Sequence, residues 1–203
     1  MNTAAALEHI RRRWGITAWR PLQVEAIRAH LEDRDSLVIM PTGSGKSLCY
    51  QGPAVVMPGT VVVVSPLIAL MKDQVDSLER RQISAAFLNS TQLVHEQIKV
   101  EHLLLAGELR LLYVSPERFA SPAFMALLLD SPIRSVVVDE AHCISQWGSD
   151  FRPDYAKLGE KLAALRSLKT PALTKGGPGG SPFSIHAYTA TATPEVRAEI
   201  TES

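Results

Sequence analysis

Short apolar runs that alternate with longer helical segments constrain the fold of this chain more than any other feature. Six runs are rich in β-branched residues and are expected to be strands, at residues 36–40, 60–65, 84–89, 109–115, 135–140 and 184–190. The segments between them repeat apolar positions with helical spacing, which predicts helices. Strands that are apolar throughout and separated by helices form a parallel sheet covered on both faces. We therefore predict an α/β fold in which ligands bind beyond the carboxyl ends of the strands.

Length and composition favour one domain. The 203 residues are 46% hydrophobic, enough to bury one sizeable core, so residues 1–203 are expected to be a single domain. Residues 1–20 are expected to form an N-terminal helix and a lead-in, with Gly15 ending the helix and Pro21 beginning the next one. Residues 171–182 hold four glycines and three prolines, which predicts a flexible surface insertion.

Charge and cysteine content exclude several classes of protein. The 21 basic residues balance 21 acidic ones, which excludes a globally basic nucleic-acid binder but leaves room for a local basic patch. The run Arg11–Arg13 is interpreted as a solvated helix face rather than as a nucleic-acid contact. The only cysteines, Cys49 and Cys143, provide neither a disulfide framework nor a four-thiol zinc site, which fits a reducing compartment. No secretory signal is recognised, and the uncharged stretch 47–71 is broken by prolines, so neither export nor a membrane span is expected.

A glycine-rich turn follows the first predicted strand. The sequence Pro-Thr-Gly-Ser-Gly-Lys-Ser at 41–47 lies between that strand and a helix, an arrangement that directs backbone N–H groups and a helix N-terminus at an anion. Lys46 is expected to reach terminal phosphates, and the Ser47 hydroxyl to ligate Mg²⁺. The alternative, a flexible turn with a solvent-facing lysine, fits the flanking strand and helix less well.

Two acidic residues end the fifth predicted strand. Asp139 is placed to hold the Mg²⁺ shell beside the phosphate loop, and Glu140 to orient and deprotonate an attacking water. Taken alone, the pair could equally mark a strand-to-turn transition. The presence of the phosphate loop favours catalysis.

The phosphate loop together with Asp-Glu-Ala-His at 139–142 resembles superfamily 2 helicases, and further segments resemble the RecQ family of DNA helicases. These are Trp19–Gln23, Ser65–Val75, Leu88–Thr91, Tyr113–Arg118, Cys143–Pro153 and Thr189–Thr191. The methionine at position 40, where the general phosphate-loop pattern has glycine, is similar to the helicase variant of the loop. The resemblance covers residues 14–197 and implies a RecA-like P-loop NTPase domain.

The resemblance implies ATP and Mg²⁺ as cofactors. Adenine would be recognised by Arg20 and Gln23, and His142 would relay between the nucleotide and Thr189 or Thr191. Mg²⁺ would be ligated through Ser47 and Asp139, and catalysis carried by Lys46, Asp139, Glu140 and His142. The phosphates would be held by Thr42, Gly43, Ser44, Gly45, Lys46 and Ser47.

The resemblance also implies a nucleic-acid contact along the strand ends. Its residues would be Ser65, Lys72, Gln74, Asn89, Ser90, Ser115, Trp147, Phe151 and Arg152. Two alternatives stay open, because Ser65 and Ser115 could be simple helix N-caps and the two aromatic residues could pack against the domain's own helices. The family usually has histidine where this chain has Ser149, and Ser149 is expected to weaken the link between DNA binding and ATP turnover.

The activity implied by the resemblance is ATP-dependent 3′-to-5′ unwinding of DNA in repair or recombination. The expected partners are single-stranded DNA, duplex junctions and a second RecA-like domain, which supplies an arginine finger in this family and is expected to be absent from these 203 residues. Residues 1–203 alone are therefore expected to hydrolyse ATP poorly. The expected location is the cytoplasm with the nucleoid in a bacterium or the nucleus in a eukaryote. A nucleotide-dependent switch or adaptor without unwinding is the alternative function, and a small P-loop kinase is disfavoured.

Overall fold

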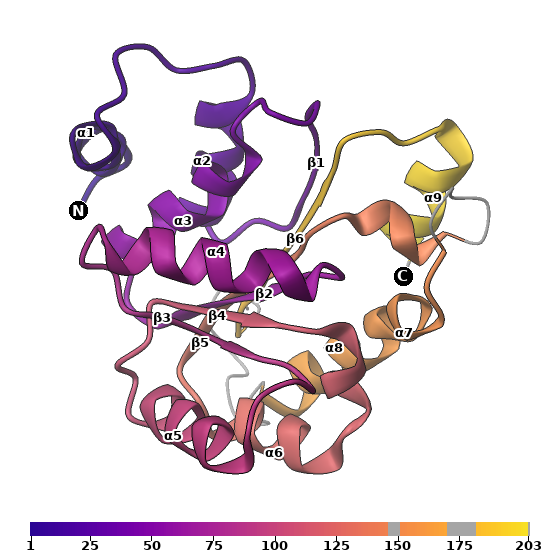
Figure 1. Cartoon of the computed structure of the whole chain (residues 1–203). Helices are drawn as coiled ribbons and strands as arrows, with labels where there is room; N and C mark the ends of the chain where they lie inside the picture. Colours follow the sequence, from indigo (N-terminus) through magenta and orange to yellow (C-terminus); the bar gives the residue numbers. More distant parts are fainter. Residues whose placement is uncertain (146–150, 170–181, 203) are drawn as a thin grey trace, which may run out of the picture.

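The computed structural model describes residues 1–145, 151–169 and 182–202, and its centre is one parallel sheet (Figure 1). All six predicted strands are confirmed, and they lie in the order β1-β6-β5-β2-β4-β3. Every pairing in the sheet is parallel. The strands are β1 (Ser36–Ile39), β2 (Thr60–Val64), β3 (Ala85–Leu88), β4 (Leu111–Val114), β5 (Ile133–Val138) and β6 (Ser184–Thr189). The predicted α/β fold class is therefore confirmed.

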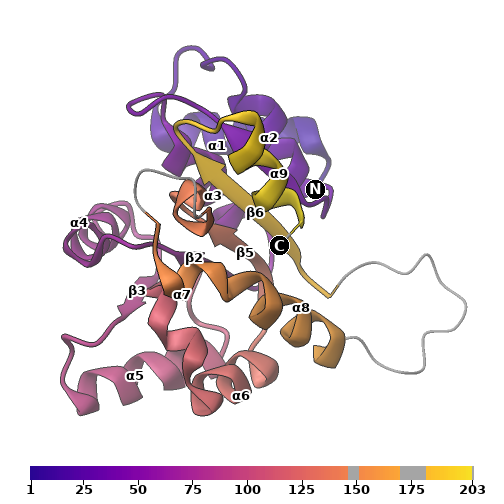
Figure 2. The ribbon, with the colours of Figure 1, turned by 90° about the vertical axis from the view of Figure 1, so that its right-hand side faces the viewer.

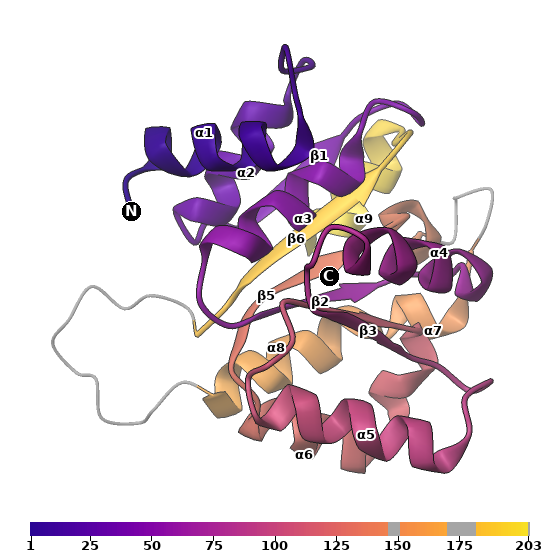
Figure 3. The same cartoon turned by 60° about the vertical axis from the view of Figure 1, so that its left-hand side comes forward.

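Helices cover both faces of the sheet, as Figures 2 and 3 show from two further sides. One face carries α1 (Thr3–Trp14), α2 (Gln23–Leu31), α3 (Lys46–Val56) and α4 (Ile68–Glu79). The other carries α5 (Val94–Leu105), α6 (Pro122–Asp130), α7 (Pro153–Ala156), α8 (Leu158–Lys169) and α9 (Pro194–Glu202), with the 3-10 turns η1 (Pro116–Ala120) and η2 (Ala141–Ile144).

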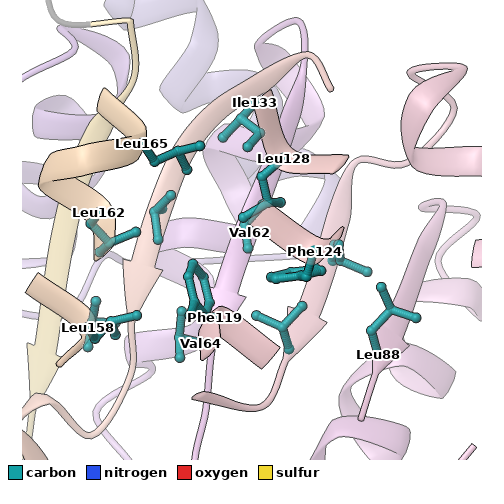
Figure 4. Packing of buried hydrophobic residues seen from close by; sticks show 14 of the residues in the cluster. Val62, Val64, Leu88, Phe119, Phe124, Leu128, Ile133, Leu158, Leu162 and Leu165 are labelled. Carbon is teal, nitrogen blue, oxygen red and sulfur yellow. The ribbon is translucent and has the colours of Figure 1, made fainter. Parts of the chain in front are cut away.

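The pleat of the central strand β2 divides the core into two clusters. Val61 and Val63 pack with the helices of the first face, whereas Val62 and Val64 pack with those of the second. Figure 4 shows part of the second cluster, in which Phe119 and Phe124 meet edge to face with ring centroids 5.3 Å apart. All five residues of β2 are buried, which explains why the strand is apolar throughout rather than alternating.

The entry into α2 differs from the sequence prediction. Gly15 ends α1 in the left-handed conformation (φ 66°), as predicted, but α2 begins at Gln23 rather than at Pro21. Pro21 and Leu22 form a turn in which Leu22 has φ 66°, an unfavourable angle for a residue with a side chain. The turn brings Arg20 and Gln23 against the phosphate loop, a tertiary effect that local propensity does not encode.

Two further sequence expectations concern charge and the uncharged stretch 47–71. Arg11 and Arg12 both pair with Glu8, at 2.7 Å, on the exposed side of α1, which is the solvated arrangement that was predicted. The stretch 47–71 folds as most of α3, β2 and the start of α4. Within the described residues, no helix is long and apolar enough to cross a membrane.

Candidate nucleotide and nucleic-acid site

The phosphate loop joins β1 to α3 through two glycines in the left-handed region. Gly43 has φ 78° and Gly45 has φ 87°, angles that a residue with a Cβ adopts at a cost. Gly45 is the N-cap of α3 and offers no side chain to cap it. The first N–H groups of α3 therefore point out of the helix end without a side-chain acceptor, which suits an anion.

Met40 and Lys46 form the base of the loop. Met40 is buried (1% exposed) in the first core cluster, and its N–H donates to the Thr189 carbonyl at 3.0 Å. Glycine at this position would lose that packing, which accounts physically for the departure from the general pattern. The Nζ of Lys46 donates to the Met40 carbonyl at 3.2 Å, so the ammonium group already lies under the loop.

Arg20 and Gln23 support the loop from the α2 side. The Arg20 guanidinium donates to the Gly43 carbonyl. The Gln23 side chain accepts from the Arg20 N–H at 2.9 Å and donates to the carbonyls of Ser44 and Gly45 at 3.3 and 3.4 Å. A Cβ on Gly45 would lie 2.6 Å from the Gln23 Nε2, which shows how closely the two segments approach. Their proposed contact with adenine stays a prediction.

Asp139 and Glu140 lie at the carboxyl end of β5, beside the loop. Burial and the neighbouring Glu140 carboxylate raise the pKa of Asp139 to about 6, against the opposing effects of the Glu140 N–H and of Lys46. Glu140 itself has φ 50°, a left-handed conformation that costs about 1–3 kcal/mol and is typical of functional sites. A cation beside Asp139 would compensate for its burial.

His142 is oriented by Glu140 and β6. Its Nδ1 lies 3.0 Å from the Thr189 Oγ1 and 3.3 Å from a Glu140 carboxylate oxygen. Because the Thr189 hydroxyl donates its hydrogen to the Thr191 carbonyl at 2.8 Å, its oxygen accepts from His142, and Nδ1 therefore carries the proton. The structure thus brings together the residues of the predicted relay.

A cavity of about 310 Å³ collects most of the predicted catalytic and phosphate-binding residues. Its lining consists of Thr42, Gly43, Gly45, Lys46, Ser47, Tyr50, Ser65, Leu67, Leu70, Met71, Gln74, Tyr113, Asp139 and Glu140. Residues of the phosphate loop, of the end of β5 and of α4 thus line one space. The lining also includes Tyr50 and Tyr113, which sequence reasoning missed. Tyr50 could have been found, because it lies one helical turn after Ser47 on α3.

A larger cavity, of about 630 Å³, lies between β1, β6, α8 and α9. The two charged residues in its lining, Asp35 and Arg166, bind each other through two hydrogen bonds of 2.8 and 2.9 Å. Among the described residues, none of the phosphate loop lines this cavity, so the smaller cavity is the candidate site.

The strand-end polar residues divide into accessible and buried ones. Asn89 is 1% exposed and its carboxamide oxygen accepts from the N–H and hydroxyl of Thr91, so its side chain shapes the turn after β3. Ser115 is also 1% exposed, and its hydroxyl has no hydrogen-bond partner among the residues that the structure describes. Ser65 makes only a long contact of 3.4 Å with the Leu67 N–H. Helix capping is therefore absent at Ser115 and marginal at Ser65.

The remaining nucleic-acid candidates lie at the same edge of the sheet. Lys72 on α4 and Ser90 after β3 are exposed. Arg152 donates to the Pro66 carbonyl at 3.2 Å, and the Phe151 beside it is 38% exposed. Trp147 and Ser149 lie outside the described residues, as does the predicted insertion 171–182 apart from Pro182.

The residues of the smaller cavity fit a magnesium nucleotide. The uncapped N-terminus of α3 and the Lys46 ammonium suit phosphate oxygens, and the Ser47 hydroxyl and Asp139 carboxylate are oxygen donors of the type that Mg²⁺ prefers. The raised pKa of Asp139 is the mark of a carboxylate whose burial a positive charge would offset.

Comparisons with known proteins agree with this geometry. The family model described as "DEAD/DEAH box helicase" matches residues 20–200. The chain is 48% identical over 169 residues to the "ATP-dependent DNA helicase RecQ" of Haemophilus influenzae and 46% identical over 187 residues to the "ATP-dependent DNA helicase Q5" of Rattus norvegicus. These matches cover 83% and 89% of this chain but only 27% and 18% of the two relatives.

Solved structures share the fold. The structure of the Mycobacterium smegmatis helicase Lhr bound to ssDNA and AMP-PNP has a TM-score of 0.68 at 25% identity, over 94% of this chain and 25% of that one. The DUF1998 helicase MrfA bound to DNA and AMPPNP has a TM-score of 0.71 at 16% identity, over 98% and 28%, which supports the RecA-like fold alone. On the match of the family model, the chain belongs to the DEAD/DEAH box helicase family and is a homologue of RecQ helicases.

Proposed function

We propose that this chain is the ATP-binding and DNA-binding half of a RecQ-type motor, which hydrolyses ATP to move 3′ to 5′ on DNA in repair or recombination. The observation that carries the proposal is the shared cavity, in which the phosphate loop, the Asp139–Glu140 pair and α4 meet. Because the chain spans about a quarter of its bacterial RecQ relative, a second RecA-like domain would complete the motor. Work on DNA would place the protein with the nucleoid of a bacterium or in a eukaryotic nucleus.

The residues present would divide the chemistry among them. The Lys46 ammonium and the N–H groups at the start of α3 would neutralise phosphate oxygens, and Arg20 and Gln23 would hold the loop while contacting adenine. Ser47 and Asp139 would ligate Mg²⁺, which supplies charge neutralisation when bound. Glu140 would accept a proton from the attacking water. The His142 ring, whose Nδ1–H donates to the Thr189 hydroxyl, would lie beside the Glu140 carboxylate, 3.3 Å from Nδ1, and so keep that carboxylate oriented toward the water.

DNA would lie along the carboxyl ends of β2, β3 and β4. Lys72 and Arg152 would bind phosphates, Phe151 would stack on an unpaired base, and Ser65, Gln74 and Ser90 would donate hydrogen bonds. Because Asn89 and Ser115 are buried, they would support the loops that follow β3 and β4 and would not contact DNA directly.

ATP hydrolysis by the complete natural protein, measured with and without single-stranded DNA, tests the proposal. We expect DNA to stimulate hydrolysis and the substitution Glu140→Gln to reduce the stimulated rate by about 10²–10⁴-fold while leaving nucleotide binding intact. Glu160→Gln on α8 is the matched control and should change nothing. Nucleotide binding without DNA-stimulated hydrolysis in the wild type would instead favour a switch or adaptor.

A further inference from the structure

Gln51 lies where three elements meet beneath the candidate site. It belongs to α3 and is 8% exposed. Its Nε2 donates to the Gln74 Oε1 of α4 and to the Tyr113 hydroxyl of β4, both at 2.9 Å. A carboxamide nitrogen carries two hydrogens, so each bond uses one of them and the nitrogen is fully satisfied.

Both partners of Gln51 line the candidate cavity, Gln74 from α4 and Tyr113 from β4, and Ser47 and Tyr50 of α3 line the same cavity. Burial raises the pKa of Tyr113, while side-chain hydrogen bonds with Gln51 and Tyr50 oppose the rise. Burial likewise raises the pKa of Tyr50, and a side-chain hydrogen bond with Ser47 opposes it. Both hydroxyls keep their protons at neutral pH. Through Gln51, the helix that begins at the phosphate loop is thus hydrogen-bonded to one cavity-lining side chain on α4 and to another on β4.

The hydrogen bonds of Gln51 require particular partner atoms, which apolar core packing does not. Tyr50 and Tyr113 are 1% and 2% exposed, and an apolar side chain at position 51 could fill the same space. A buried polar network is favourable only when every member is satisfied, so it holds its elements in one relative arrangement. Here the elements are the helix that begins at the phosphate loop and the helix that carries Lys72.

We propose that Gln51 is a positioning residue that couples the nucleotide site to the DNA contact of α4, an inference that rests on the proposed function. A nucleotide that moves the start of α3 would displace Gln51 and, through Gln74, the DNA-binding end of α4. Coupling between two such sites typically changes the affinity at one of them by about 5–150-fold.

The test uses Gln51→Met in the complete natural protein. Methionine fills a similar volume and cannot donate a hydrogen bond. We expect the KM for ATP and the unstimulated rate to stay within about two-fold, because Gln51 does not line the cavity. The factor by which a non-hydrolysable ATP analogue changes the affinity for a fluorescent single-stranded DNA should fall toward one. DNA stimulation of hydrolysis should fall with it.

A double-mutant cycle separates this role from simple loss of stability. If Gln51 acts through Gln74, the double variant Gln51→Met/Gln74→Leu should lose no more coupling than either single variant loses. Thr60→Val is the matched control, since it removes a buried hydrogen bond (Thr60 Oγ1 to the Leu109 carbonyl, 2.8 Å) at the opposite edge of the sheet. Thr60→Val should keep full coupling.

The outcomes distinguish this inference from the proposed function. A wild-type protein without DNA-stimulated hydrolysis would overturn the proposed function. Stimulation in the wild type that survives unchanged in Gln51→Met would overturn the coupling role alone. If Gln51→Met does not fold, Tyr113→Phe replaces it, because that variant removes the hydroxyl that accepts from Gln51. Tyr113→Phe should show the same loss of coupling. Full coupling in Tyr113→Phe would overturn the inference.

Discussion

At the scale of single residues, burial of the Asp139 carboxylate destabilises the folded state at neutral pH. Its pKa of about 6 lies above its ordinary value of 3.8, so between these pH values the folded state binds more protons than the unfolded state. Stability from this group is therefore present below pH 3.8 and is lost as pH rises through 6. At pH 7 its burial as an anion costs about 2–3 kcal/mol.

Asp139→Asn should consequently stabilise the nucleotide-free protein at pH 7 by about 2–3 kcal/mol. The gain should shrink to about 1 kcal/mol near pH 4.5, where the folded wild type already carries the proton. Urea unfolding at both pH values measures the difference. The same variant should lose the stabilisation that MgATP gives the wild type. Equal stability of the two proteins at pH 7 would contradict this account of the buried charge.

The two glycines of the phosphate loop provide a second comparison of single residues. Alanine at either position must adopt a left-handed angle, which costs about 1–2 kcal/mol. At Gly43 an added Cβ meets nothing within 4 Å, whereas at Gly45 it meets the Gln23 Nε2 at 2.6 Å. Gly45→Ala should therefore also displace Gln23. We expect it to weaken ATP binding at least about ten-fold more than Gly43→Ala, a loss of about 1.4 kcal/mol. Calorimetric titration of both variants checks the ranking, and equal affinities would show that Gln23 does not support the loop.

At the scale of elements, buried histidines connect α2 with β1 and β6. The rings of His30 and His186 stack with centroids 3.4 Å apart. His30 binds the Tyr188 hydroxyl at 3.0 Å, and His186 binds the hydroxyls of Ser36 and Ser184, both at 2.8 Å. Burial lowers the pKa of His186 to about 3 and that of His30 well below 6.5. Both rings are neutral in the folded state at neutral pH.

Acid should therefore weaken this junction well above the pH at which carboxylates titrate. Below pH 6.5 the histidines of the unfolded state bind protons, whereas the two buried histidines of the folded state stay neutral. The free energy of unfolding therefore falls as pH decreases toward the pKa values of the folded state. Each histidine contributes a slope that approaches about 1.4 kcal/mol per pH unit once the pH is well below 6.5. Between pH 7 and 5, the part of the pH dependence of the unfolding free energy that comes from the pair should be about half as steep in His30→Phe as in the wild type. An unchanged slope in His30→Phe would show that His30 is not held neutral.

The elements also show what the sequence can and cannot predict. The valine-rich run of β2 predicts a strand buried on both faces, because burial follows directly from side-chain type. The start of α2 was misplaced because Leu22 adopts a left-handed angle that tertiary contacts with the phosphate loop impose. The His30–His186 stack and the Gln51–Tyr113 bond join residues far apart in the sequence. Predicting them requires the strand order, which local patterns do not contain.

At the scale of the whole molecule, a net charge of zero limits how DNA can be bound. No long-range basic field would assist the proposed DNA binding, so its affinity would depend on a few contacts at the sheet edge, among them the proposed contacts of Lys72 and Arg152. Each phosphate neutralised on a single strand contributes about 0.7 to the slope of log affinity against log salt concentration. Residues 1–203 alone should therefore bind single-stranded DNA weakly, with a slope of only about 1–3.

Lys72→Ala should lower that slope by about 0.7 and weaken binding about equally for all sequences, because a phosphate contact carries no base information. Lys99→Ala is the matched control, since Lys99 is an exposed lysine on α5, on the opposite face of the sheet. Both substitutions remove one positive charge. Any difference between the two salt slopes is therefore due to the position of the lysine and not to the total charge. Fluorescence anisotropy at several salt concentrations gives both slopes. Equal slopes would indicate that α4 does not contact the DNA backbone and that the nucleic-acid path lies elsewhere on the molecule.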